Sequence, residues 1–153
     1  KIKTRDEISR IAAAARAEGR RLVFTNGCFD ILHRGHTELL HAAAAMGDVL
    51  IVGLNADRSV AGLKGPERPL MSEDDRAHLL AALAAVDYVV LFDEETPLEL
   101  IAAIAPDVLV KGGDYAPDAI VGADLVRARG GEVRVVPLLP GRSTSAIVRR
   151  LTE

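Results

Sequence analysis

The sequence predicts an α/β fold, a doubly wound parallel sheet of five strands covered by helices on both faces, in three layers. Apolar runs of strand length alternate with segments of helical periodicity, which is the pattern of right-handed βαβ units. The run at 48–55 is continuously apolar, as a strand buried on both faces requires. The 153 residues, 49% of them hydrophobic, suit a single domain over 1–153, with an N-terminal helix (1–19) and a core (20–153).

Capping residues predict where the helices begin and end. Thr4 and Glu7 form a capping box before an alanine-rich helix over about 5–18. Further helices are expected from the histidine pair at 33–36 to Met46, from the Ser72 cap to about Ala85, behind the cap Thr96-Pro97-Leu98-Glu99, and from Ser143 onward. Gly47 ends the second of these helices.

Five strands are expected between the helices, at Arg20–Thr25, Asp48–Asn55, Tyr88–Phe92, Val108–Val110 and Glu132–Pro137. Residues 56–71 are predicted to form a loop, because two glycines and two prolines interrupt the pattern. Ligands of such sheets bind outside the carboxyl ends of the strands, where the strand order reverses. If the first and fourth strands are neighbours, segments 25–30 and 111–115 face each other across one crevice.

Composition excludes several classes of function. The net charge is −3 with both signs interspersed, so the chain lacks the basic footprint of a nucleic-acid-binding protein. Cys28 is the only cysteine, which excludes an internal disulfide and a cysteine-rich metal site. Nothing resembles a signal peptide or a membrane span of about 20 apolar residues. We therefore expect a cytoplasmic protein with small charged partners, and neither nucleic acid nor membrane as a partner.

His33-Arg34-Gly35-His36 is the most informative motif, because it lies where a strand turns into a helix. Backbone N–H groups at a helix start attract phosphate, and two imidazoles add hydrogen-bond donors. Gly35 would let the backbone approach a ligand closely. Two histidines without a third ligand do not indicate a zinc site, and no metal ligands are assigned. The pattern alone is also compatible with two surface histidines in a loop.

The segment Gly27-Cys28-Phe29-Asp30-Ile31-Leu32-His33-Arg34-Gly35-His36 resembles the G-x-F-D-x-x-H-x-G-H signature of the cytidylyltransferase-like nucleotidyltransferases. Two later segments, Val110–Tyr115 and Gly141–Ile147, narrow the resemblance to bacterial D-glycero-β-D-manno-heptose 1-phosphate adenylyltransferases. The similarity extends from about Arg21 to Leu151 and implies a Rossmann-like sheet. Ser145 stands where that family has a threonine, a change that keeps the hydroxyl group.

This resemblance implies transfer of AMP from ATP to D-glycero-β-D-manno-heptose 1-phosphate, giving ADP-heptose and pyrophosphate. It also implies Mg²⁺ bound with ATP, a homodimer, and a role in supplying heptose for cell-envelope lipopolysaccharide. A phosphate oxygen is already nucleophilic at neutral pH, so neither a catalytic serine nor a general base is required. Positioning and charge neutralisation remain as the work of the protein.

The resemblance assigns roles to residues of this chain. His33 and His36 would donate to the triphosphate, with Lys64 on its β- and γ-phosphates. The nucleotide-binding residues are expected to be Asn26, Gly27, Cys28, Phe29, Gly35, Arg142, Ser143 and Thr144. The substrate-binding residues are expected to be Asp30, Arg68, Arg76, Lys111, Gly112 and Asp114, with Lys111 neutralising the attacking phosphate and Asp114 accepting from sugar hydroxyls.

Several of these residues also have a purely structural interpretation. Lys64 could be a solvated side chain, Asp30 could cap its own turn or help to hold magnesium, and Ser143 could act only as a helix cap. Arg76 could pair with neighbouring aspartates instead of a substrate. Two alternative functions also stay open: a cytidylyltransferase acting on glycerol 3-phosphate or another phospho-alcohol, and a nucleotide-binding regulatory module without catalysis.

Overall fold

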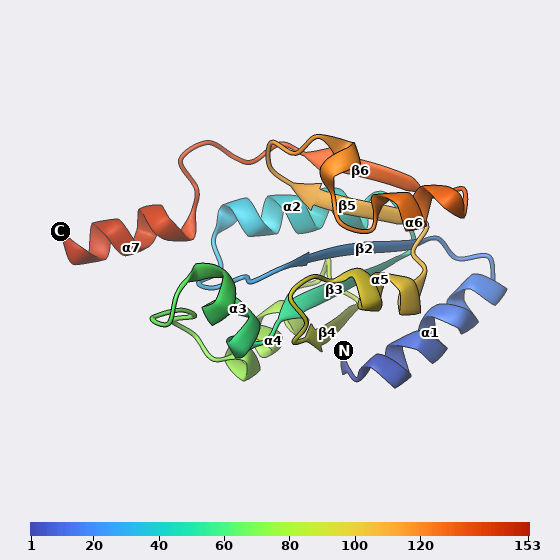
Figure 1. Cartoon of the computed structure of the whole chain (residues 1–153), viewed down its shortest axis with the longest axis horizontal. Coiled ribbons are helices and arrows are strands. Elements are labelled where there is room, and N and C mark those ends of the chain that lie inside the picture. The colour runs from blue at the N-terminus through green and yellow to red at the C-terminus, as the bar shows by residue number, and fades with distance from the viewer.

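A computed structural model describes all residues 1–153 as a six-stranded parallel sheet with helices on both faces (Figure 1). The strand order is β1-β4-β3-β2-β5-β6. The strands are β1 (Ile2–Lys3), β2 (Leu22–Gly27), β3 (Val49–Asn55), β4 (Tyr88–Phe92), β5 (Val108–Gly112) and β6 (Glu132–Val136). The predicted α/β class and its doubly wound sheet are confirmed, with β1 as an additional two-residue edge strand.

Alternation along the central strands divides the core into two layers. Leu22, Phe24 and Ile51 point to one face, whereas Val23 and Leu50 point to the other. The first face is covered by α1 (Arg5–Ala17), α5 (Leu98–Ile104) and α6 (Ala123–Ala128), and the second by α2 (Arg34–Ala44) and α4 (Glu73–Ala81). All seven residues of β3 are buried, which explains the continuous apolar run of this strand.

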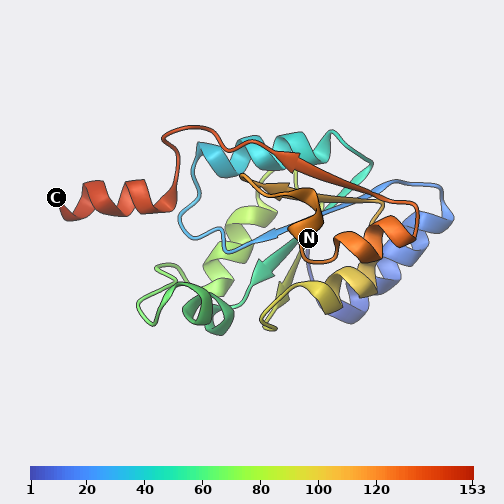
Figure 2. The same cartoon turned by 45° about the horizontal axis from the view of Figure 1, so that its top comes forward.

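Two helices lie away from these layers. α3 (Asp57–Lys64) stands at the carboxyl edge of the sheet, and α7 (Thr144–Thr152) projects from the body in both views (Figures 1 and 2). A short 3₁₀ turn, η1 (Pro117–Ala119), precedes α6. No helix combines the length and the apolar character needed to cross a bilayer.

The prediction of a loop over 56–71 is wrong for its first half, because α3 occupies 57–64. Asp57 lies in the first turn of this helix, and Ser59 and Val60 are buried, so its inner face packs despite Gly62. Gly65 then ends the helix with a φ of 105°. The Ser72 cap is confirmed, but α4 stops at Ala81 instead of continuing to Ala85.

Aspartates fix the amino-terminal edge of the sheet, opposite the edge where ligands bind. Asp107 accepts a hydrogen bond from the backbone N–H of Leu22, and Asp87 accepts one from Leu50, each at 2.7 Å. Each aspartate precedes its own strand and binds the neighbouring one. The pairs therefore set the register between adjacent strands.

The strand order reverses at β2, which lies between β3 and β5. Chain leaving β2 returns through α2 to β3 on one side, whereas β5 is added later on the other side. The expected adjacency of the first and fourth predicted strands is confirmed by the β2–β5 pairing. The carboxyl ends of β2 and β5 are therefore the place to look for a ligand site.

The centre of β3 has no room for a side chain at Gly53. A Cβ atom there would lie 2.7 Å from Cζ of Phe24 and 3.2 Å from Cδ2 of Leu100. We expect Gly53→Ala to lower the free energy of unfolding by about 1–3 kcal/mol through overpacking. The control, Gly62→Ala, has no heavy atom within 4 Å and should stabilise α3 by about 0.5–1 kcal/mol. Urea unfolding measures both, and unchanged stability of Gly53→Ala would contradict this packing.

Candidate functional site

An open cavity of about 470 Å³ lies at the carboxyl ends of β2, β3, β4 and β5. Its lining joins segments that are far apart in the sequence. The residues expected at the site that line it are Asn26, Gly27, Cys28, Phe29, Asp30, His36, Lys64, Lys111, Gly112 and Thr144. The cavity therefore brings together the turn after β2, the end of α3, the end of β5 and the start of α7.

The two histidines cap the helix on which they lie. His33 is the N-cap of α2, and its Nδ1 accepts a hydrogen bond from the backbone N–H of Gly35 at 3.0 Å. Nδ1 of His36 accepts from the backbone N–H of His33 at 3.4 Å. Since Nδ1 is an acceptor in both rings, the neutral imidazoles carry their proton on Nε2. Each ring can therefore offer an Nε2–H donor.

Burial keeps both imidazoles neutral. Burial, with smaller electrostatic contributions from His33 and Lys64, lowers the pKa of His36 to about 4. Burial also lowers the pKa of His33. The rings stack with their centroids 3.8 Å apart, and His36 also contacts the Phe29 ring at 5.2 Å. His36 lines the cavity, whereas His33, also expected to donate to the triphosphate, does not line it and stacks on His36.

Gly35 has a different role from the one expected. It is buried and does not line the cavity. A Cβ atom at this position would lie 2.8 Å from Cε1 of His33 and 3.2 Å from the carbonyl oxygen of Arg142. The glycine therefore makes room for the ring of His33 and for the chain that leads into α7, so a direct ligand approach at Gly35 is not seen.

The turn between β2 and α2 has an unusual backbone. Phe29 and Ile31 have φ values of 47° and 60°, in the left-handed region that a β-branched residue rarely adopts. Asp30 lies between them with its carboxylate fully buried. Such strain persists only where surrounding contacts determine the conformation, and it is typical of functional sites.

Asp30 provides those contacts. Its carboxylate accepts from Arg68 Nε at 2.9 Å and from the backbone N–H groups of Leu70 and Met71 at 2.8 and 3.0 Å. Its carbonyl oxygen accepts from Thr144 Oγ1 at 2.6 Å. Burial opposes ionisation, but these hydrogen bonds outweigh it and hold the pKa of Asp30 below its ordinary value. Asp30 and Arg68, expected to contact substrate, instead bind each other and position the loop before α4.

Arg76, expected to bind substrate, does not line the cavity. Its side chain is fully buried. The guanidinium donates to the carbonyl oxygens of Cys28, Asn55 and Met71 at 2.7–3.0 Å and pairs with Asp57 at 2.8 Å. All its donors face backbone or Asp57, so Arg76 joins the ends of β2 and β3 to α4. The alternative, pairing with its neighbours Asp74 or Asp75, is not seen either.

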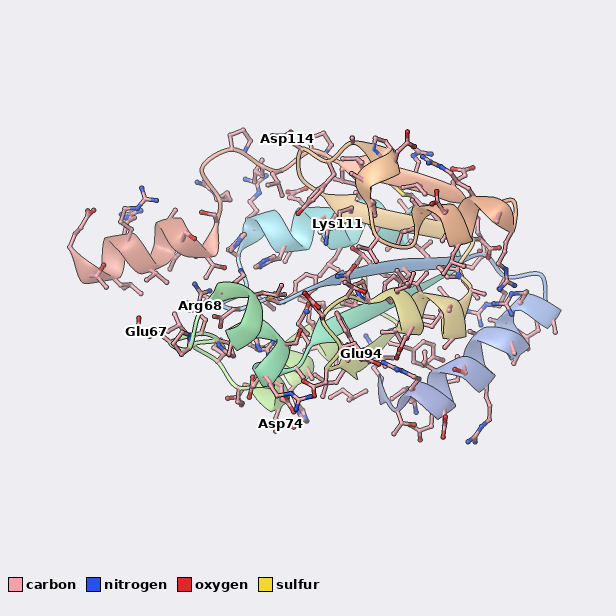
Figure 3. All side chains as sticks on the ribbon, in the orientation of Figure 1. Glu67, Arg68, Asp74, Glu94, Lys111 and Asp114 are labelled. Carbon is pink, nitrogen blue, oxygen red and sulfur yellow. The ribbon has the colours of Figure 1, made fainter.

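Two lysines supply the positive charge of the cavity. Lys64 is the last residue of α3, and Lys111 lies near the end of β5. Burial lowers the pKa of Lys111, and its Nζ lies 5.5 Å from the centre of the Tyr115 ring. Tyr115 lines the cavity. Asp114, expected beside Lys111, is exposed and does not line the cavity, and it lies apart from Lys111 in Figure 3. The φ of 123° at Gly113 sets this outward course.

The start of α7 completes the wall. Ser143 is the N-cap, and its Oγ accepts from the backbone N–H of Ala146 at 3.1 Å. Thr144 is buried against Asp30 and lines the cavity. Arg142 is exposed and does not line the cavity. The capping role of Ser143 is therefore seen, and the free N–H groups of the first turn lie beside the cavity.

Nine further residues line the cavity that motif reasoning did not single out, namely Leu39, Asn55, Leu63, Glu95, Thr96, Pro97, Tyr115, Val121 and Leu138. Asn55 ends β3, and Glu95–Pro97 follow β4. The rule that ligands lie beyond strand ends would have found both segments had it been applied to every strand.

No group of three or more His, Cys, Asp or Glu side chains is arranged to hold a metal ion.

Comparison with known proteins agrees with this geometry. A family model described as cytidylyltransferase-like matches residues 24–150. The bifunctional protein HldE of Trichlorobacter lovleyi is 58% identical over 153 residues, which are 100% of this chain and 31% of that protein. The bifunctional protein HldE of Wolinella succinogenes is 59% identical over 151 residues, 99% of this chain and again 31% of the relative. The chain thus spans less than a third of these curated relatives.

Two solved structures share the fold. The lipopolysaccharide core biosynthesis protein from Thermoplasma volcanium has a TM-score of 0.62 and 27% identity, covering 79% of this chain and 98% of that one. Pantoate-beta-alanine ligase from Francisella tularensis, complexed with beta-gamma ATP and beta-alanine, has a TM-score of 0.66 over 94% of this chain and 68% of its own. Its identity of 15% shows the fold alone. Both likenesses confirm a Rossmann-like sheet.

Acid should destabilise the protein through His36. Its pKa of about 4 in the folded chain lies below the value of about 6.5 expected after unfolding, so the unfolded chain binds the extra proton. The free energy of unfolding should therefore fall as pH drops from about 6.5 toward 4. His36→Asn, which cannot titrate, should show a shallower fall. Urea midpoints at about pH 7.5 and about pH 5 measure this, and parallel declines in both proteins would refute the assignment.

Proposed function

The chain belongs to the cytidylyltransferase-like family, and from this premise we propose that it transfers AMP from ATP to D-glycero-β-D-manno-heptose 1-phosphate, giving ADP-heptose and pyrophosphate. The observation that carries the proposal is the single cavity shared by His36, Lys64, Lys111 and the first turn of α7. These groups are donors and cations, suited to a polyphosphate. Relatives named bifunctional protein HldE, at 52–59% identity, support an activity in nucleotide-activated heptose synthesis.

The acceptor choice has further support from a solved structure. The Thermoplasma volcanium protein that shares this fold at 27% identity is named for lipopolysaccharide core biosynthesis. A heptose destined for cell-envelope polysaccharide agrees with that name. Because this chain spans 31% of its curated relatives, the proposal concerns the activity of this domain, residues 1–153, as one nucleotidyltransferase unit.

The nucleotide would bind along the hydrogen-bond donors at the carboxyl end of β2. In this proposal the Nε2–H of His36 points to the α-phosphate, with His33 fixing its ring, and Lys64 binds the β- and γ-phosphates. The backbone N–H groups at Cys28 and Phe29 and the first turn of α7 add donors for the triphosphate. At that turn Ser143, Thr144 and Arg142 would also contact the triphosphate. Asn26 and Gly27 would form part of the same wall of the nucleotide site.

The reaction would need no general base. An oxygen of the acceptor phosphate attacks the α-phosphorus, the bond between that phosphorus and the bridging oxygen to the β-phosphate breaks, and pyrophosphate leaves with the electron pair. In this proposal Lys111 and Gly112, which line the cavity, receive the attacking phosphate. Negative charge grows on the α-phosphate oxygens in the transition state, and the fixed donor of His36 would stabilise it there.

We propose Mg²⁺ as the ion that accompanies ATP. The oxygens of Asp30 are occupied by Arg68, Leu70 and Met71, and the chain offers no carboxylate cluster. This donor set fits an ion held by phosphate oxygens and water, which Mg²⁺ favours, better than a cage of protein ligands. When bound, the ion supplies neutralisation of phosphate charge.

The resemblance also leads us to propose a homodimer in the cytoplasm, where ATP is available.

Substrate assays test the proposed function. We expect pyrophosphate release with ATP and D-glycero-β-D-manno-heptose 1-phosphate, and little release when CTP replaces ATP or glycerol 3-phosphate replaces the sugar phosphate. Efficient turnover with CTP and glycerol 3-phosphate alone would favour a cytidylyltransferase instead. Nucleotide binding without pyrophosphate release from any pair would favour a regulatory module that lacks catalysis.

Kinetics of variants test the role of His36. His36→Asn keeps an acceptor near the position of Nδ1 but loses the Nε2–H donor, so kcat should fall by about 10²–10³-fold. His36→Gln can place an amide N–H near the lost donor and should retain more activity. Lys64→Ala should mainly raise the KM for ATP, because it contacts phosphates in both ground and transition states. An unchanged kcat for folded His36→Asn would exclude the assigned role.

A further inference from the structure

We propose that the loop after β4, residues 93–97, recognises the hydroxyl groups of the acceptor sugar through Glu95 and Thr96, and that Arg5 of α1 holds this loop in place. The inference rests on the proposed function and adds a specificity determinant to it. Glu95, Thr96 and Pro97 line the cavity beside Asn55 and Leu63. Neither the histidine motif nor the lysine-diglycine segment includes any of these residues.

The charge of Glu95 decides which part of the substrates it can face. Five acidic or basic side chains line the cavity, namely Asp30, His36, Lys64, Glu95 and Lys111. Asp30 is buried and fully hydrogen-bonded, so Glu95 is the one carboxylate there with free oxygens. A carboxylate beside a triphosphate would be repelled. Glu95 therefore suits the uncharged part of a substrate, and carboxylate oxygens accept hydrogen bonds from hydroxyls.

The position of the loop 93–97 agrees with a role at the uncharged part of the substrate. β4 is separated from β2 by β3, so its end lies on the opposite side of β2 from Lys111 on β5. The donors assigned to phosphates come from the ends of β2, α3 and β5 and the start of α7. The wall at the end of β4, next to Leu63 of α3, offers a carboxylate, the Thr96 hydroxyl and the Asn55 amide, a set that matches a polyhydroxylated ligand.

A network that begins in α1 fixes the loop. Both terminal nitrogens of Arg5 donate to the Glu94 carboxylate, with Nη2 to Oε2 at 3.0 Å, and the Glu94 side chain is 32% exposed. This pair holds the pKa of Glu94 well below its ordinary range. Figure 3 shows Glu94 near the start of α5. A bidentate arginine pair restrains orientation as well as distance.

The backbone of Glu94 is held from the other side. Its carbonyl oxygen accepts from Ser59 Oγ at 3.4 Å, and that hydroxyl accepts from Asn55 Nδ2 at 2.9 Å. Asn55 is buried at the end of β3. The loop thus lies between α1 and the end of β3, which presents Glu95 and Thr96 to the cavity. Arg5 is a positioning residue, since it does not line the cavity itself.

Steady-state kinetics with ATP and D-glycero-β-D-manno-heptose 1-phosphate tests the proposal. Glu95→Ala should raise the KM for the sugar phosphate about tenfold, the scale of one lost hydrogen bond to a charged group, and leave the KM for ATP unraised. Arg5→Gln should shift the same KM in the same direction, and Arg5→Lys should restore part of it. The control Asp124→Asn removes an exposed carboxylate on α6 outside the cavity and should change neither constant.

The outcomes separate the two levels of inference. No turnover by the unaltered chain rejects the proposed function, and this assignment with it. Turnover by the unaltered chain with an unchanged sugar-phosphate KM in Glu95→Ala rejects the assignment alone. A raised KM for ATP, or an altered Mg²⁺ requirement, would place Glu95 at the nucleotide or its metal and also overturn it. Urea unfolding of each variant confirms that the comparison is between folded proteins.

Discussion

The turn between β2 and α2 is the constraint on which the site depends, and Asp30 fixes it. Two residues beside it, Phe29 and Ile31, occupy the left-handed region, at a cost of about 1–3 kcal/mol each for non-glycine residues. Hydrogen bonds from Arg68, two backbone N–H groups and Thr144 offset that cost. Through these bonds one aspartate sets the positions of the loop before α4 and the start of α7. The histidine pair, the backbone donors and α7 can face one cavity because they share this anchor.

Arg76, like Asp30, is a buried charged residue that fixes several segments of the chain near the cavity through hydrogen bonds. A buried guanidinium is costly unless its donors are satisfied, and here three carbonyl oxygens and Asp57 satisfy them. Two of those carbonyls belong to Cys28 and Asn55, at or just past the ends of β2 and β3. The floor of the site is therefore built from a cation that binds strand ends, which leaves the positive charge of Lys64 and Lys111 for ligands.

The sequence was sufficient to predict the fold and the edge of the sheet where the site lies. Apolar runs located all five expected strands within about two residues of their observed ends, and the end of a parallel strand dictates where its following loop goes. Individual side chains were harder. Arg76 and Lys111 are both cations near the cavity, and only tertiary partners show that the first is buried among carbonyls. Tyr115 lines the cavity and Asp114 does not, beside a positive φ at Gly113 that residue types alone do not reveal. The helix α3 was missed because Gly62 weakens a pattern only eight residues long.

The neutrality of the paired imidazoles has a consequence for how charge is distributed over the site. Two rings stacked at 3.8 Å beside a lysine would repel each other if both were protonated, and burial disfavours the charged form as well. Neutral Nε2–H donors bind a ground-state phosphate less tightly than cations would. In the proposed reaction, their hydrogen bonds would strengthen as negative charge develops on the α-phosphate oxygen, and so would favour the transition state over the bound triphosphate. Lysine cations suit a different task, the attraction of phosphates that keep their charge throughout. In the proposed reaction, neutral donors at the reacting phosphate would serve catalysis, and the lysine cations around it would serve binding.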